Sequence, residues 1–204
     1  MRGAAPSVQP LAGAPRGLLE KTAGEVRTAI ADMDLRLSAF STLNRLLPDF
    51  ALCRVRSTLF KLTGCDLRRG AVVLGAIKVV GPPRAITQLK AGERCVIAPG
   101  VTFGLDAPIT LGKRVSIGPG ATLYTGTHEL GAGSQRMSYE VVGRPIVVED
   151  GVWIGMQSLI LPGVRLGHGS VVAAGAVVHD DVAPNTLVMG NPAKVVRTLP
   201  LGDR

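Results

Sequence analysis

Histidine is scarce in this 204-residue chain, and one of its three copies stands where a regular sequence repeat is interrupted. This residue, His128, lies early in the segment YTGTHELGAGSQRMSYEVVGRP. Imidazole titrates near neutral pH, so a positioned histidine can remove the proton of a hydroxyl group that is about to react. We therefore interpret His128 as a candidate general base. The alternative is a turn residue that bonds local backbone.

The other histidines and the cysteines do not have the spacing of a metal site. His168 in LGHGSV and His179 in VHDDVA fall at outward places of the repeat and are interpreted as solvated turn residues. Because the three histidines are widely separated, a zinc site with three histidine ligands is not predicted. Cys53, Cys65 and Cys95 are an odd number without ligand spacing. We interpret them as buried free thiols, which suits a reducing compartment and a cytoplasmic protein.

The sequence on both sides of His128 repeats with a period of six residues. Every sixth residue from Val148 to Val178 is aliphatic, and a similar apolar run extends from Ile97 to Leu123 with two extra residues. A period of six fits neither a helix nor a simple strand. A short strand and a turn do fit it, and three such sides close a coil of 18 residues, which stacks Val148 on Leu166. The sequence therefore predicts a mainly β protein, with a parallel β-helix over residues 70–198.

The residues before the repeats have a different pattern. Residues 1–16 are rich in Ala, Pro and Gly and are expected to form a disordered tail rather than a signal peptide. Residues 17–69 are expected to form an N-terminal helical region. Its apolar residues follow a heptad stripe from Leu19 to Phe40, which would pack on its own domain or against another subunit. A second helix is predicted over residues 49–62, and its basic and apolar residues leave a weak membrane-surface contact as an alternative to plain packing.

Charge and hydropathy exclude other function classes. The formal net charge is +8, but the 23 Lys and Arg residues are scattered and nucleic-acid motifs are absent. An anionic small ligand or attraction to anionic lipid therefore explains the charge better than a nucleic acid. No stretch of about 18 apolar residues exists, so a transmembrane segment is not predicted.

Three segments resemble the hexapeptide-repeat acyltransferases, in the branch of maltose, galactoside and nodulation-factor O-acetyltransferases. They are LGKRVSIGPGATLYTGTHEL, PIVVEDGVWIGMQSLILPGV and NTLVMGNPAKVVR, and the matched stretch runs from about Leu111 to Arg197. The resemblance implies left-handed coils, a homotrimer, acetyl-CoA as cosubstrate and no metal. It also implies acetyl transfer to a hydroxyl of a sugar or sugar-containing small molecule, with His128 as general base. An N-acetyltransferase acting on an aminosugar and a catalytically silent scaffold remain alternatives.

The same resemblance implies further site residues. The expected cosubstrate-binding residues are a tryptophan in VWIG, a small residue in VVAAGAV and two cations in AKVVR that could meet phosphates: Trp153, Ala174, Lys194 and Arg197. The residues expected to bind the acceptor or orient His128 lie one coil earlier or around the inserted loop 125–145: Asp106, Glu129, Tyr124 and Arg136. The chain departs from the family at residues 98–100, where many members have an asparagine, and at His179–Asp180, where the family has Thr–Lys.

Overall fold

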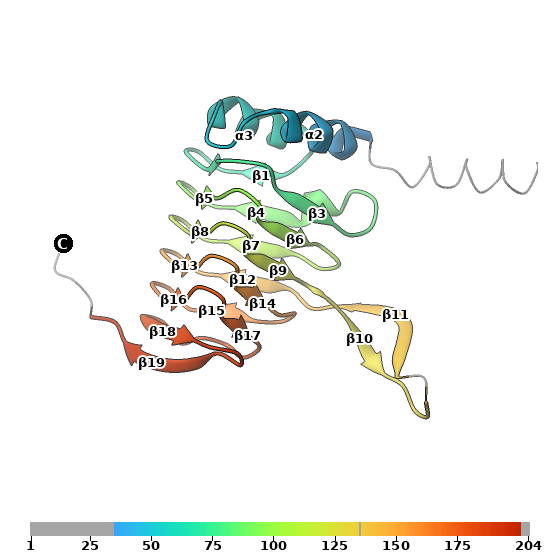
Figure 1. Cartoon of the computed structure of the whole chain (residues 1–204), viewed down its shortest axis with the longest axis vertical. Coiled ribbons are helices and arrows are strands. Elements are labelled where there is room, and N and C mark those ends of the chain that lie inside the picture. Colours follow the sequence, from blue (N-terminus) through green and yellow to red (C-terminus); the bar gives the residue numbers. More distant parts are fainter. Residues whose placement is uncertain (1–34, 135, 201–204) are drawn as a thin grey trace, which may run out of the picture. The chain divides into compact units, whose positions relative to one another are not determined.

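Short parallel strands dominate the computed structural model, which describes residues 35–134 and 136–200 of the chain (Figure 1). The expected disordered tail over residues 1–16, and the part of the heptad stripe up to Met33, lie outside the described residues. Two helices precede the strands: α2 (Leu35–Leu46) and α3 (Cys53–Leu62). The helix predicted over residues 49–62 therefore begins only at Cys53. Phe50 and Leu52 have left-handed backbone, which a right-handed helix cannot contain.

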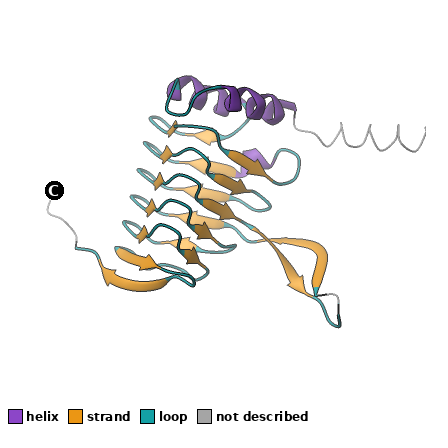
Figure 2. Ribbon diagram, viewed as in Figure 1, coloured by secondary structure: helices purple, strands orange, loops and turns teal. Residues whose placement is uncertain are grey.

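The strands form three parallel sheets, which we name A, B and C, and successive strands of the chain visit them in turn (Figure 2). Sheet A contains β1 (Asp66–Leu67), β4 (Leu89–Ala91), β7 (Ile109–Leu111), β12 (Ile146–Val148) and β15 (Arg165–Leu166). Sheet B contains β2 (Val72–Val73), β5 (Val96–Ile97), β8 (Ser116–Ile117), β13 (Trp153–Ile154), β16 (Val171–Val172) and β18 (Thr186–Met189), with β19 (Lys194–Thr198) antiparallel at its edge. Sheet C contains β3 (Lys78–Val80), β6 (Thr102–Gly104), β9 (Thr122–Tyr124), β14 (Leu159–Ile160) and β17 (Val177–Val178). The predicted parallel β-helix is confirmed.

The register of the sheets follows the six-residue repeat. Val148 pairs with Leu166, as predicted, and Ile154 pairs with Val172. These four side chains are buried, because the first place of each hexad points to the axis of the coils. Each coil thus buries its apolar side chains against the coils before and after it.

Extra residues leave the coils at corners, and only the shorter insertion adds side chains to the core, namely Ala85 and Ile86. The largest insertion lies between β9 of sheet C and β12 of sheet A, and it forms an antiparallel hairpin of β10 (Gly126–Leu130) and β11 (Met137–Gly143). The buried Thr125 anchors its base: the hydroxyl donates to the carbonyl of Gly104 at 2.8 Å and accepts from the backbone N–H of Ala107 at 2.9 Å. A shorter insertion contains the 3₁₀ helix η1 (Ala85–Gln88).

The two helices cover the N-terminal end of the coils (Figure 1). Phe40 of α2 packs on Phe60 of α3 with ring centroids 5.0 Å apart, and Leu37 packs against the same core. The described end of the heptad stripe therefore packs on its own domain. None of the described helices is long and apolar enough to span a membrane.

A buried arginine joins these helices to the first coil. The fully buried guanidinium of Arg56 donates to the side-chain oxygen of Asn44 and to the carbonyl oxygens of Leu47, Pro48 and Leu74, the last at 2.9 Å. The bonds reach the end of α2, the connection to α3 and the first strand layer. A charged group without water needs such a complete set of partners.

Replacing Arg56 should therefore destabilise the fold. Arg56→Met keeps the aliphatic stem but leaves several buried carbonyls without a donor, so we expect the free energy of unfolding to fall by about 3 kcal/mol. Urea unfolding at one fixed chain concentration measures this loss. Arg54→Met, on the exposed side of the same helix, is the control and should change stability by less than about 0.5 kcal/mol. Equal stability of the two variants would contradict the stabilising role of the Arg56 hydrogen bonds.

Candidate functional site

The hairpin carries His128 in a defined tautomer. The residue is exposed on β10, and its Nδ1 lies 3.2 Å from the carbonyl oxygen of Glu140. A carbonyl oxygen can only accept, so this contact requires the proton on Nδ1. Nε2 then has a free lone pair, which is the state that a general base needs.

Asp106 lies at the base of the hairpin, on the face that carries His128. A Cβ added to Gly126 would collide with the carboxylate of Asp106, so this carboxylate packs directly over the Gly126 backbone. Gly126 and His128 are two residues apart on one strand and therefore point to the same face, separated by about 7 Å. Tyr124 lies beside them, with its ring over the backbone of Gly104. Glycine is required at both positions because a side chain would displace the groups packed there.

The other expected acceptor residues lie further out. Glu129 follows His128 on β10, and alternation directs it to the opposite face of the hairpin. Arg136 is exposed near the hairpin tip, where its carbonyl accepts from the N–H of Gly131 at 2.7 Å. The structure thus brings Asp106 and Tyr124, more than Glu129 and Arg136, to the base of the His128 face.

The hairpin face that carries His128 is also apolar. His128 pairs with Val141, and Leu130 pairs with Met137, across the two strands. Val141, Leu130 and Met137 are exposed, as is Tyr139, which lies in the irregular stretch of β11 between the two paired positions. An isolated two-stranded hairpin with such a face is marginally stable in water, which indicates that something covers it. The six-residue repeat does not extend into this insertion and so gave no signal for these residues.

The expected cosubstrate-binding residues gather on the outer face of sheet B. Trp153, which is 59% exposed, pairs with Val171; Val171 pairs with Leu187; and Leu187 pairs with Arg197 across the antiparallel edge. Paired residues point to the same face of a sheet, so Trp153 and Arg197 lie on one outward row. Lys194 pairs with Met189 on that same face.

A groove of about 460 Å³ runs along this row. Trp153 and Ala174 both line it, together with apolar neighbours from four successive layers of sheet B: Pro119, Met156, Val171 and Leu187. Sequence analysis missed Met156 and Leu187 as groove residues. Steps of 18 residues from Trp153 lead to Val171 and then to Met189, whereas the structure pairs Val171 with Leu187, so the repeat alone does not predict Leu187.

Within one chain, His128 and this groove lie on opposite sides of the coils. The hairpin leaves the corner between sheets C and A, whereas Trp153 belongs to sheet B, which is the side opposite that corner (Figure 1). His128 therefore cannot reach a ligand in the groove of its own chain.

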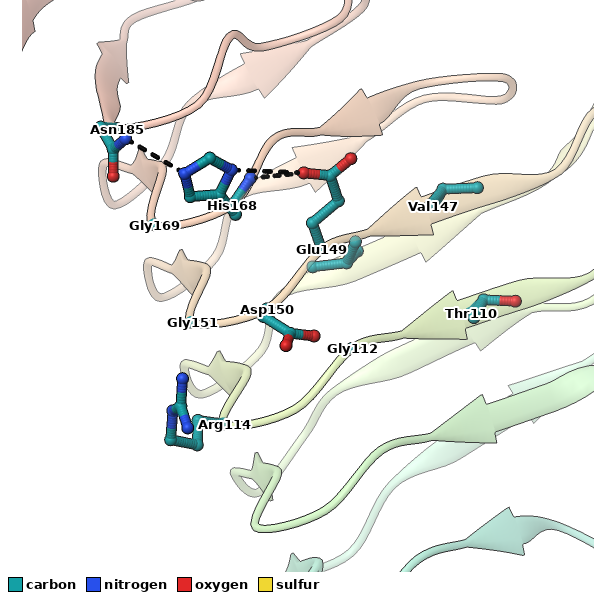
Figure 3. A pocket seen from close by; sticks show the side chains of 11 residues that line it. Thr110, Gly112, Arg114, Val147, Glu149, Asp150, Gly151, His168, Gly169 and Asn185 are labelled. Carbon is teal, nitrogen blue, oxygen red and sulfur yellow. Dashed lines mark hydrogen bonds and ion pairs between the residues drawn. The ribbon is translucent and has the colours of Figure 1, made fainter.

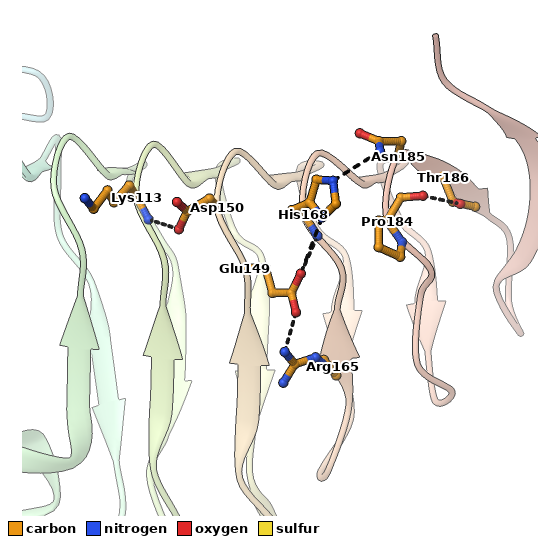
Figure 4. A network of polar contacts seen from close by, with 8 residues as sticks. All are labelled: Lys113, Glu149, Asp150, Arg165, His168, Pro184, Asn185 and Thr186. Carbon is orange, nitrogen blue, oxygen red and sulfur yellow. Dashed lines mark hydrogen bonds and ion pairs between the residues drawn. The ribbon is translucent and has the colours of Figure 1, made fainter. Parts of the chain in front are cut away.

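A larger pocket, of about 720 Å³, lies at the corner between sheets A and B, away from both groups of expected residues (Figure 3). Glu149 in its lining joins a network of polar contacts (Figure 4). Its carboxylate accepts from the backbone N–H of His168 at 2.8 Å and forms an ion pair with Arg165. Asn185 lies 3.3 Å from His168 Nε2. These bonds link neighbouring coils, so we assign the network to stability. His168 is exposed but is not merely solvated.

The surroundings of one glutamate and two cysteines shift their pKa values. The N–H of His168 lowers the pKa of Glu149, and the Arg165 guanidinium lowers it further, against the raising effect of desolvation. Burial raises the pKa of the Cys65 thiol to about 12 and also raises that of Cys95, so both remain protonated and unreactive at neutral pH. Among the residues that the structure describes, no group of three His, Cys, Asp or Glu side chains could hold a metal ion.

Known proteins share this architecture. A family model for the bacterial transferase hexapeptide (six repeats) matches residues 145–180. A hexapeptide-repeat-containing acetyltransferase from Vibrio cholerae is 31% identical, with a TM-score of 0.69 over 93% of this chain and 95% of that chain. A structure of the V. cholerae O1 biovar eltor protein, complexed with acetyl coenzyme A, is 32% identical, with a TM-score of 0.65 over 79% of this chain and 86% of that chain.

A curated Schizosaccharomyces pombe protein described as an acetyltransferase is 48% identical over 98 residues, which cover 48% of this chain and 47% of that protein. The chain therefore spans about half the length of this curated relative. The near full-length match to the V. cholerae structure shows the family directly: the chain belongs to the hexapeptide-repeat acetyltransferases. The resemblance noted in the sequence is confirmed.

The low pKa of Glu149 has a consequence for stability. Its folded-state pKa is depressed, so its contribution is fully present above the unfolded-state value near 4.3 and is lost as the pH falls through the folded-state value. We expect Glu149→Gln to be less stable than the parent by about 1 kcal/mol at neutral pH, with the gap closing in acid. Urea midpoints across a pH series measure the gap. Glu129→Gln, at an exposed position, should show none, and a gap that persists in acid would contradict the ionic origin.

Proposed function

We propose that this protein transfers an acetyl group from acetyl-CoA to a hydroxyl of a sugar or sugar-containing small molecule, with His128 as general base. The observation that carries the proposal is the contact between His128 Nδ1 and the Glu140 carbonyl, because in the neutral imidazole it selects Nε2 as the nitrogen with the free lone pair. The free cysteines suit a reaction in the reducing cytoplasm.

The chemistry needs only one proton carrier. Nε2 of His128 takes the proton of the acceptor hydroxyl while its oxygen attacks the thioester carbonyl carbon. The tetrahedral intermediate collapses as the carbon–sulfur bond breaks. The proton then passes from His128 to the departing thiolate, which restores the neutral imidazole. The Glu140 carbonyl stabilises the imidazolium that forms between these two transfers, because Nδ1 still donates to it.

The acceptor would bind at the base of the hairpin. The carboxylate of Asp106 lies there on the His128 face and can accept hydrogen bonds from sugar hydroxyls. Tyr124 adds an aromatic ring next to it, and Glu129 and Arg136 could contact larger acceptors further out. An acceptor with several neighbouring hydroxyls suits this combination of an apolar surface and a carboxylate.

The cosubstrate would lie along the outer face of sheet B. Its pantetheine arm fits the apolar groove of Trp153 and Ala174, where the small Ala174 side chain allows close approach. Arg197 and Lys194 lie beyond the groove, on the antiparallel edge of the sheet, and could pair with the phosphates. The complex of the V. cholerae relative with acetyl coenzyme A supports this choice of donor.

The active site would be shared between copies in a homotrimer. His128 and the groove face opposite directions within one chain, so a second copy must supply one of the two. The exposed apolar face around His128 and the exposed apolar groove around Trp153 are complementary surfaces for such a contact. Closed threefold symmetry would form three equivalent sites and leave no copy of either surface open.

His128→Ala should fold normally and lose acetyl transfer by about 10² to 10⁴-fold, because a positioned base contributes that much. Thiol release from acetyl-CoA, measured with a panel of sugars, aminosugars and nucleosides, gives the rate. Leu130→Ala, which alters the same hairpin face without touching a proton carrier, is the control for displacement of the hairpin. Near-parental turnover of His128→Ala, with the substitution confirmed by mass, would remove the residue from the mechanism.

Mixing two inactive variants tests the shared site. His128→Ala chains keep the cosubstrate face, and Lys194→Ala/Arg197→Ala chains keep the base, so mixed trimers should contain some intact sites and regain part of the activity. The variants are unfolded together, refolded and assayed, and light scattering should give three times the 21.2 kDa chain mass. Each variant refolded alone is the control. Full activity of a monomer would refute the shared-site model.

A further inference from the structure

Large apolar side chains project from the connection between α2 and α3. Leu46 is 75% exposed, Phe50 is 67% exposed and Leu52 is 59% exposed, and Val55 on the first turn of α3 is exposed beside them. We call these four residues the cap tip. Leu46 ends α2, Val55 belongs to α3, and Phe50 and Leu52 lie in the connection between them; neither the hairpin nor the sheet B groove includes these residues.

The backbone of the cap tip is fixed. The N–H of Phe50 donates to the carbonyl of Leu74 at 2.6 Å, and the carboxylate of Asp49 accepts from the N–H of Ala76 at 3.1 Å. The guanidinium of Arg56 donates to the carbonyls of Leu47 and Pro48. These hydrogen bonds hold the backbone of the tip against the first coil, so its side chains are exposed in a defined conformation.

This shape places two bulky side chains where glycine or asparagine is usual. Phe50 has a φ of 62° and Leu52 a φ of 50°, in the left-handed region that residues with a Cβ avoid. Neither side chain recovers the cost by packing inside the chain, because both are exposed. Seven non-glycine residues of the described chain have this backbone, and Phe50 and Leu52 are the two apolar ones among them. Strain of this kind clusters at functional segments.

The surroundings of the tip carry a net positive charge. Arg45, Arg54 and Lys61 are exposed on the two helices, and Asp66 is paired with Arg68. Asp49, which accepts from the backbone N–H of Ala76, keeps its negative charge, so the three cations outnumber one unpaired carboxylate among the described residues. The whole chain carries a formal charge of +8. A surface that combines projecting apolar groups with cations fits a bilayer that contains anionic lipids.

We propose that the cap tip docks this protein on an anionic membrane surface. Leu46, Phe50 and Leu52 would enter the headgroup region while Arg45 and Arg54 contact lipid phosphates. A second copy of this chain fits the tip poorly, because a two-fold contact would bring the arginines of the two copies together. The proposal does not depend on the catalytic assignment, since the tip shares no residue with the proposed active site.

The full chain should co-sediment with vesicles of phosphatidylcholine and phosphatidylglycerol in equal parts, and not with vesicles of phosphatidylcholine alone. Phe50→Asn/Leu52→Asn removes the anchors with a residue that tolerates left-handed backbone, so unfolding midpoints should stay unchanged or rise. Vesicle binding should fall about tenfold or more. Arg45→Gln/Arg54→Gln should weaken binding by about tenfold, whereas Lys78→Gln/Lys90→Gln, which removes two exposed charges from the coils, should not.

Four outcomes would overturn the proposal. The first is a parent protein that does not bind anionic vesicles. The second is an asparagine variant that binds them as the parent does. The third is a Lys78/Lys90 variant that loses as much binding as the arginine variant, which would indicate attraction by net charge alone. The fourth is a change of molar mass in light scattering when Phe50 and Leu52 are replaced, which would make the tip a contact between protein chains.

Discussion

No coil of this β-helix can bury its own apolar side chains, and the rest of the structure follows from that constraint. A coil is too thin to have an interior, so Val148 is shielded only when Leu166 and Leu111 stack on either side of it. The backbone hydrogen bonds obey the same rule, since each strand finds its partners in the neighbouring coils. Any residue that does not fit the six-residue spacing must leave at a corner, or it would break two stacks at once.

The constraint also determines where chemistry can be placed. Inward positions are occupied by the stack, so reactive and binding side chains are confined to corners and outward rows. The corner between sheets C and A holds the hairpin with His128, and the outward row of sheet B holds Trp153 and Arg197. Because the three sheets form the three sides of the β-helix, the hairpin and the outward row of sheet B face different directions. In the proposed function, assembly with further copies joins them, so oligomerisation supplies the proximity that a single chain lacks.

The sequence predicts much of this because the repeat encodes both direction and register. A strict period of six identifies the inward residues, pairs Val148 with Leu166 and assigns Trp153 to an outward row. It cannot predict the hairpin face, because residues 126–143 follow strand alternation and belong to no coil. The tautomer of His128 also lies beyond the sequence, since it depends on the carbonyl of Glu140, a main-chain group that any residue could provide. The left-handed residues Phe50 and Leu52 gave no signal, because neither residue type is associated with that backbone conformation.

A β-helix has two open ends, and this chain closes them by different means. At the N-terminal end the stack is covered by α2 and α3. Arg56 ties both helices to the first coil, and no carboxylate of the described residues pairs with it. The partial negative charge of carbonyls at the end of α2 replaces a counter-ion there. At the C-terminal end the chain reverses and adds β19 as an antiparallel edge strand, whose Lys194 and Arg197 discourage pairing with another sheet. In the proposed function these same cations hold the cosubstrate phosphates, so the strand that closes the fold would also complete the binding groove. Neutralising them would then weaken two properties together, cosubstrate binding and protection of the sheet edge, because both depend on charge at one exposed strand.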